Sequence, residues 1–161
     1  MIIDNLLKSN PFSLDNKTKN KIFSEQMKLL TIHHYKNCKI YKKIIKNLKF
    51  NIKKNNKVED FPMLPVRLFK KFDLKSIPDG KVIKKLVSSG TSGQKLSKIY
   101  LDKKNSINQV KVLNKIMSNI LGSERLPMLI IDQNPILQDR SVFNARVAAI
   151  HGFSIFGKNY N

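Results

Sequence analysis

A run of six small residues after a strand-like segment restricts the fold of this chain more than any other feature of its sequence. Residues 82–87 and 97–101 are short, rich in Val, Ile, Leu and Tyr, and typical of β-strands. The run that follows the first of them supplies four hydroxyl groups and two glycines: Ser88, Ser89, Gly90, Thr91, Ser92 and Gly93. The sequence therefore predicts a strand, a small-residue loop and a second strand.

Such a loop is suited to holding an anion. Glycine permits backbone conformations that bring the chain close to a ligand. Successive N–H groups can then converge on an anion, and hydroxyl groups add further donors. We interpret residues 88–93 as a cradle for the β- and γ-phosphates of ATP. The alternative is a plain hairpin turn, but that connection normally uses two residues such as Asn-Gly.

The sequence around residues 88–96 does not match either of two better-known phosphate-binding loops. A Walker P-loop would have a glycine where this chain has Lys95. A dinucleotide-binding fingerprint would be followed by a helix, whereas the residues after this loop resemble a strand.

The first third of the chain has helical periodicity. Ser13 is the expected N-cap, with Asp15 in the first turn. Apolar and aromatic positions then recur at three- and four-residue steps, which predicts one helix or two helices in line. These positions are Phe23, Met27, Leu30, His34, Cys38, Tyr41, Ile45 and Leu48.

The remainder alternates between breaks, helices and strands. Two prolines within residues 61–66 exclude a regular helix there. The other expected elements are a short helix at 67–73, a turn at 78–80, a helix from about Asp102 to Gly122, a buried strand at 128–131 and a helix at 141–150 that stops near Gly152.

The net charge of +20, from 31 basic and 11 acidic residues, raises the alternative of a basic module that binds nucleic acid or an acidic surface. Residues 36–57 contain no acidic side chain. However, the basic residues are 27 Lys and 4 Arg, and Lys, Asn and Ile are in excess together. Base readout favours Arg. We therefore favour compositional bias over nucleic-acid binding.

Length and residue content favour a cytoplasmic protein of about one domain. The 161 residues fit the usual size of roughly 100–200 residues per domain. No apolar run approaches the roughly 20 residues that a membrane span needs. Cys38, the single cysteine, excludes an internal disulfide and fits a reducing compartment.

Several single residues are candidates for a functional site. His33 and His34 are adjacent, so on a helix they point about 100° apart, and we expect one to pack and the other to be solvated. We expect Cys38 to be a small buried apolar residue. Asp132 is a weak candidate after the expected strand, while nothing in the sequence decides the roles of Arg140 and Arg146.

The loop and its surroundings resemble a known family. Residues 87–94 (Val-Ser-Ser-Gly-Thr-Ser-Gly-Gln) resemble the phosphate loop of the adenylate-forming superfamily. Residues 61–70 (Phe-Pro-Met-Leu-Pro-Val-Arg-Leu-Phe-Lys) are similar to the LuxE-type acyl-protein synthetases, which supply acyl groups to fatty-acid reductases in bacterial bioluminescence. Further similar stretches are 33–38 with Tyr41, 131–132, 139–140 and 152–157. The resemblance extends from about residue 12 to residue 161.

The resemblance implies an α/β fold: a helical section over about residues 1–60, then the first part of a mixed-sheet adenylation domain over about 61–161. It implies an acid–thiol ligase that converts a carboxylic acid, expected to be a fatty acid, into an acyl-adenylate and passes the acyl group to a thiol. ATP and Mg²⁺ would be required, with Ser88, Ser89, Gly90, Thr91, Ser92 and Gly93 holding the departing phosphates.

The same resemblance implies that the chain is incomplete. The adenine- and Mg²⁺-binding motif, the C-terminal lid and the acyl-accepting cysteine of the family fall outside these residues. The expected partners are the missing C-terminal part, an acyl reductase or another acyl acceptor. An inactive remnant or one half of a split enzyme is the remaining alternative. Many superfamily members have Pro-Lys after the loop, where this chain has Lys95 and Leu96.

Overall fold

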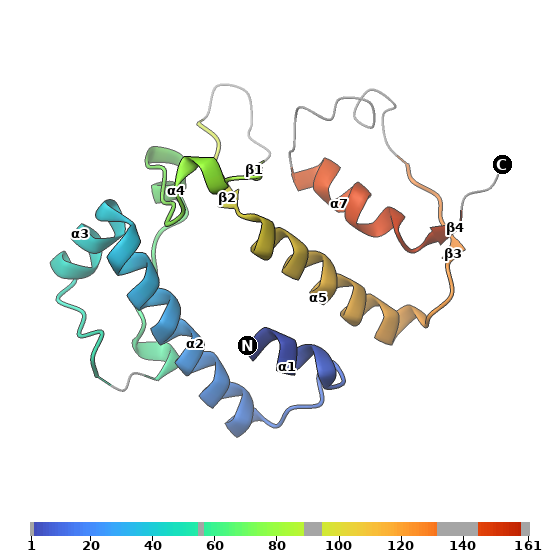
Figure 1. The fold of residues 1–161 in the computed structure, drawn as a ribbon, viewed down its shortest axis with the longest axis horizontal. Coiled ribbons are helices and arrows are strands. Elements are labelled where there is room, and N and C mark those ends of the chain that lie inside the picture. Colours follow the sequence, from blue (N-terminus) through green and yellow to red (C-terminus); the bar gives the residue numbers. More distant parts are fainter. Residues whose placement is uncertain (1, 55–56, 89–94, 132–144, 159–161) are drawn as a thin grey trace.

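The computed structural model describes residues 2–54, 57–88, 95–131 and 145–158, and it combines helices with two small sheets (Figure 1). The chain begins with a short helix, α1 (Ile2–Lys8), that contacts the later helix α5 (Lys103–Leu121). This first helix was not predicted from the sequence. In the described ranges, every helix is too short or too polar to span a bilayer.

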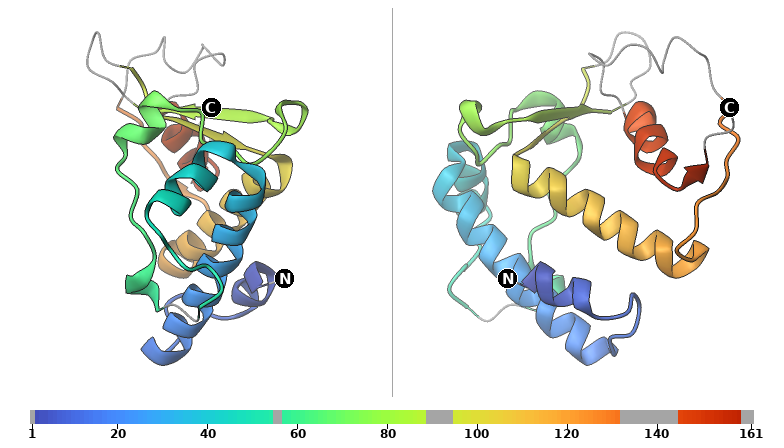
Figure 2. Two further views of the ribbon diagram at one scale, coloured as in Figure 1. Left: turned by 90° about the vertical axis from the view of Figure 1, so that its left-hand side faces the viewer. Right: turned by 45° about the vertical axis from the view of Figure 1, so that its right-hand side comes forward.

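The long helical section consists of α2 (Asn16–Asn37) and α3 (Lys39–Asn47). Asp15, and not Ser13 as expected, is the N-cap of α2, because its carboxylate accepts the Thr18 N–H at 2.9 Å. Cys38 has extended backbone angles, so the chain changes direction there. The two helices therefore lie side by side and contact each other rather than continuing in line (Figure 2).

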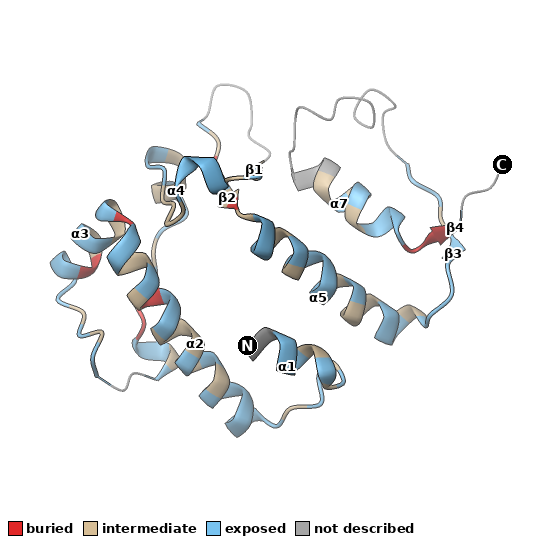
Figure 3. Cartoon of the chain, viewed as in Figure 1, coloured by how far each residue is buried: buried red, intermediate tan, exposed pale blue. Residues whose placement is uncertain are grey.

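Only part of the predicted apolar stripe is buried. Cys38 and Ile45 are 6% and 1% exposed, whereas Phe23, Leu30 and Leu48 are about half exposed. The buried positions lie near the junction of α2 and α3 (Figure 3). The core in the described part of the chain is thus small, and its other buried apolar residues are Phe61, Leu101 and Phe156.

After the 3-10 helix η1 (Val58–Asp60), α4 (Arg67–Lys71) forms where a short helix was predicted. The 3-10 helix η2 (Asp79–Lys81) occupies the predicted turn. The strands β1 (Lys84–Val87) and β2 (Lys98–Leu101) then pair antiparallel, with Val87 opposite Lys98. This confirms the predicted order of two strands around the loop.

Helix α5 begins after Asp102 and ends before Gly122, as predicted. The Asp102 carboxylate accepts the Asn105 N–H at 2.8 Å and caps its start. Gly122 ends it with a φ of 83°, a conformation that glycine adopts without steric cost. Its apolar side chains are covered only in part, because Ile107, Val110 and Ile120 are exposed.

The expected buried strand at residues 128–131 is wrong. The strand in this region is β3 (Leu126–Pro127), which pairs in parallel with β4 (Gly157–Lys158). Residues 128–131 have no regular structure, and Leu129 and Ile131 are 85% and 89% exposed. The apolar run borders a groove against α7, at Ala149, Ile150 and Phe153, but this contact does not bury Leu129 or Ile131.

The last helix is α7 (Ala145–Ser154), which overlaps the helix predicted at 141–150 and continues through Gly152. A Cβ atom at Gly152 would lie 3.2 Å from Leu113 Cδ2, so α7 approaches α5 closely at this glycine. The described chain is therefore a mixed α/β structure with one antiparallel and one parallel pair of strands.

The small core makes Ile45 the position most sensitive to truncation. We expect Ile45→Ala to lower the free energy of unfolding by about 2–5 kcal/mol, because it removes buried apolar contacts and leaves a cavity. Leu48→Ala, three residues further along, should change it by no more than about 0.5 kcal/mol, since Leu48 is 53% exposed. Urea unfolding followed by circular dichroism measures both, and equal losses would contradict this account of the core.

Candidate functional site

Ser88 and Ser97 close the base of the loop that the sequence analysis singled out. The Ser88 N–H donates to the Ser97 carbonyl oxygen at 3.1 Å, and the Ser97 N–H donates to Ser88 Oγ at 3.0 Å. The first bond extends the β1–β2 ladder by one residue pair, and in the second the Ser88 side chain replaces a backbone acceptor. The ends of the loop are therefore held together by backbone and side chain alike.

The Ser97 hydroxyl group is a second feature of this base. Ser97 is 9% exposed, and its Oγ atom is buried without a hydrogen-bond partner among the described residues. A buried polar atom without a partner is uncommon in folded proteins and calls for an explanation. From the sequence, Ser97 is expected only as the first residue of a strand. Pairing the two predicted strands would have set Ser97 opposite Ser88, which is the signal that could have found it.

Of the six predicted loop residues, only Ser88 falls among the described residues. Ser89, Gly90, Thr91, Ser92 and Gly93 lie outside them. Their role in holding phosphate stays a prediction. Asp132, a weak site candidate, and Arg140, whose role the sequence does not decide, also lie outside the described ranges.

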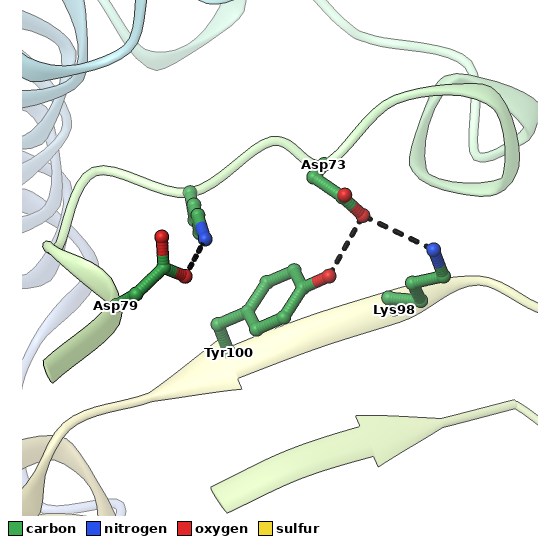
Figure 4. Close-up of polar contacts among 5 residues, drawn as sticks. Asp73, Asp79, Lys98 and Tyr100 are labelled. Carbon is green, nitrogen blue, oxygen red and sulfur yellow. Dashed lines mark hydrogen bonds and ion pairs between the residues drawn. The ribbon is translucent and has the colours of Figure 1, made fainter. Parts of the chain in front are cut away.

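A group of polar side chains ties the segment before β1 to the strand that follows the loop (Figure 4). The Asp73 carboxylate accepts hydrogen bonds from Tyr100 Oη at 2.7 Å and from Lys98 Nζ at 3.2 Å. Lys75 forms an ion pair with Asp79 and lies over the Tyr100 ring, 5.3 Å from its centre. β2 is thereby attached through its own side chains to residues 73–79.

These contacts shift the titration of both central groups. The hydrogen bond from Tyr100, and then the one from Lys98, hold the pKa of Asp73 below its ordinary value of 3.8. Desolvation, followed by the hydrogen bond to Asp73, raises the pKa of Tyr100 to about 12. Each shift stabilises the state in which a neutral phenol donates to an ionised carboxylate.

The two histidines differ in burial, as the sequence predicted. His34 is half-buried, and its Nδ1 lies 2.6 Å from the Ser76 hydroxyl oxygen. Burial, and then the charge of His33, lower the pKa of His34. His33 is exposed and contacts Asn37 on the same helix. Cys38 is buried, as expected of a small apolar residue.

The described residues contain no group of three or more His, Cys, Asp or Glu side chains able to hold a metal ion. The lysines nearest the loop differ in their surroundings. Lys95 is exposed, whereas Lys98 forms an ion pair with Asp73.

Comparison with known proteins identifies a family. The family model described as "Acyl-protein synthetase, LuxE" matches residues 1–160. No curated protein and no solved structure matches the chain.

The Tyr100–Asp73 bond predicts an unusual titration. Because the pKa of Tyr100 in the folded chain is about 12 against an ordinary 10.0, the folded state retains this proton longer, and this contribution to stability is lost as the pH rises from about 10 to about 12. We expect Asp73→Asn to lower the pKa of Tyr100, and Asp79→Asn to lower it less. Nuclear magnetic resonance of ¹³Cζ-labelled tyrosine, assigned with Tyr100→Phe, measures this. A native value near 10 would contradict the bond.

Proposed function

Because the chain belongs to the LuxE family of acyl-protein synthetases, we propose that it takes part in ATP-dependent activation of a carboxylic acid. The observation that carries this proposal is the closed base of the 88–93 loop, formed by Ser88 and Ser97 between two paired strands. A loop fixed at both ends suits a ligand whose charge must be met by donors already in position.

In the proposed reaction, a carboxylate oxygen of the acid attacks the α-phosphorus of ATP. The bond to the bridging oxygen of the β-phosphate breaks, giving an acyl-adenylate and pyrophosphate. Negative charge accumulates on the departing phosphates. Backbone N–H groups and the hydroxyls of residues 88–93 would stabilise it electrostatically, and no side chain of the loop needs to transfer a proton.

The described base of the loop fits a phosphate ligand. Within the described ranges, the buried Ser97 Oγ has no hydrogen-bond partner, and Ser88 Oγ accepts a hydrogen bond from the Ser97 N–H. Hydroxyl groups can rotate to donate to an anion. Mg²⁺ would supply charge screening; it is commonly bound by substrate phosphates together with one or two carboxylates.

The activated acyl group then has to reach a thiol. Cys38 is 6% exposed at the junction of two helices, so we propose that the acceptor is elsewhere, on a further part of the enzyme, a partner acyl reductase or coenzyme A. Exposed apolar side chains support a larger assembly. Leu129, Ile131, Val110 and Ile120 are all more than half exposed, and a partner or further domain would cover such surface.

The loop assignment predicts that nucleotide binding depends on its hydroxyl groups. We expect MgATP to bind the chain saturably, and the double change Ser89→Ala with Thr91→Ala to weaken binding at least about tenfold, since each lost charge-assisted bond is worth about 1.5–3 kcal/mol. Isothermal titration calorimetry measures both. Pyrophosphate should compete, because it resembles the leaving group.

The matched control is Ser118→Ala with Ser123→Ala, which removes two exposed hydroxyls far along the chain from the loop. The control variant should bind MgATP as the unchanged chain does. Equal affinity in the loop variant, with circular dichroism showing it folded, would contradict the assignment.

A further inference from the structure

Ser76 and His34 form a hydrogen-bonded pair that the proposed adenylation does not use. His34 Nδ1 lies 2.6 Å from the Ser76 hydroxyl oxygen, and the two residues are 42 positions apart in the chain. In the neutral imidazole that carries its proton on Nε2, Nδ1 accepts a hydrogen bond from that hydroxyl group. A serine hydroxyl group within hydrogen-bond reach of a neutral imidazole is the arrangement that activates serine as a nucleophile.

The imidazole of His34 is suited to act as a base. Burial, and then the charge of His33, lower its pKa, so at pH 7 the ring is neutral and able to accept a proton. Two neighbouring rings restrict its orientation. The centre of the His34 ring is 5.7 Å from that of Tyr41 and 5.4 Å from that of His33, and both contacts are edge-on. A base held by its neighbours stays within reach of the nucleophile.

Ser76 belongs to a segment that is attached to β2 (Figure 4). The Asp73 carboxylate accepts a hydrogen bond from Tyr100 of this strand at 2.7 Å. Lys75, the residue before Ser76, lies over the Tyr100 ring and pairs with Asp79, three residues after Ser76. These contacts hold the serine in place before any ligand binds, as a nucleophile requires.

The pair lies where two adjoining cavities meet. Ser76 and His34 line both the smaller cavity, of about 110 Å³, and the larger, of about 530 Å³. The larger is within the range of roughly 300–1,000 Å³ that small-molecule sites occupy. Phe69 and Leu74 also line both cavities and supply apolar surface beside the pair. Ser76 is partly exposed, so a substrate can reach its hydroxyl group.

The charges along the larger cavity offset one another. Lys75, Lys104 and Asp102 line it, and Lys75 forms an ion pair with Asp79. Counted with Asp79, two ammonium groups meet two carboxylates. An uncharged molecule with a short apolar group therefore suits this cavity better than an anion or a cation.

We propose that Ser76 and His34 form a catalytic dyad that takes up the acyl group of an uncharged carboxylic ester. Ser76 Oγ attacks the carbonyl carbon of the ester while its proton passes to His34 Nδ1. The bond from that carbon to the alcohol oxygen breaks, the alcohol leaves with the proton from His34, and Ser76 carries the acyl group. Water then attacks the same carbon and gives a proton to His34, the carboxylic acid leaves, and Ser76 Oγ recovers its proton. This inference goes beyond the proposed function, because ester cleavage requires no nucleotide.

Diisopropyl fluorophosphate tests the nucleophile, because it reacts with activated serine hydroxyl groups and releases fluoride. We expect it to modify Ser76 in the folded chain, within the tryptic peptide of residues 76–81, and not in the chain unfolded in urea. Mass spectrometry locates and quantifies the adduct. Absence of the adduct from Ser76 in the folded chain, or equal labelling of the folded and unfolded chain, would overturn the proposal.

The adjacent histidines supply a matched pair of variants for the base. His34 is bonded to Ser76, whereas His33 Nδ1 lies 3.3 Å from Asn37 Nδ2. We expect His34→Gln to slow labelling of Ser76 at least about 100-fold and His33→Gln to leave the rate within about twofold, because a general base contributes about 10²–10⁴-fold. Circular dichroism checks that both variants are folded. Equal rates in the two folded variants would contradict the role of His34.

Acyl transfer is measured with 4-nitrophenyl acetate, an uncharged ester whose alcohol absorbs visible light. We expect an initial burst of about one 4-nitrophenol per chain, as an acyl-enzyme accumulates, and loss of this burst in Ser76→Ala. The matched control Ser13→Ala removes an exposed hydroxyl group and should keep the burst. Lysine side chains that react with the ester are the same in both variants. A burst of equal size in Ser76→Ala would contradict acyl transfer to this serine.

These experiments contain no nucleotide, so the dyad and the loop assignment can fail separately. If Ser76 is not labelled while the loop variant Ser89→Ala with Thr91→Ala loses MgATP affinity, the dyad is contradicted and the loop assignment stands. If Ser76 is labelled through His34 while the loop variant keeps full MgATP affinity, the loop assignment is contradicted and the dyad stands.

Discussion

The pairing of Ser88 with Ser97 is the constraint on which the rest of the site depends. It ends the β1–β2 ladder with two hydrogen bonds and fixes both ends of the loop. A free loop of this size would lose conformational entropy on binding a ligand, and a closed base removes part of that cost beforehand. The next residues of β2, Lys98 and Tyr100, then contact Asp73.

β2 also contacts the segment that precedes the hairpin. Asp73 accepts hydrogen bonds from Tyr100 and Lys98, so residues before the hairpin are attached to the strand after the loop. Exposed ion pairs contribute little to stability, and these groups are partly solvated. Their effect is on geometry: they set the segment that carries Lys75 and Ser76 against β2, and both segments line one cavity.

The hairpin and α5 could be predicted from the sequence because their signals are local. A six-residue hydroxyl and glycine run, a capping Asp102 and a terminal Gly122 specify turn and helix ends through neighbouring atoms alone. The helical stripe was predicted less well, since the break at Cys38 lies within an unbroken periodic pattern. The cap was assigned to Ser13 although Asp15 is the residue whose side chain reaches Thr18.

Features that depend on distant residues could not be predicted. The run at 128–131 has the composition of a buried strand, but burial requires a second layer, and Leu129 and Ile131 remain exposed in the described chain. The contact between His34 and Ser76 joins residues 42 positions apart, and neither carries a sequence signal for the other. The cavity beside them is a product of the same long-range packing.

The most direct test of the central claim is nuclear magnetic resonance of the chain labelled with ¹⁵N only at glycine. The six glycines are Gly80, Gly90, Gly93, Gly122, Gly152 and Gly157. If residues 88–93 hold the phosphates of ATP, saturating MgATP should shift the amide signals of Gly90 and Gly93 strongly and leave that of Gly122 in place. Saturable binding that shifts other glycines and leaves Gly90 and Gly93 unmoved would contradict the account.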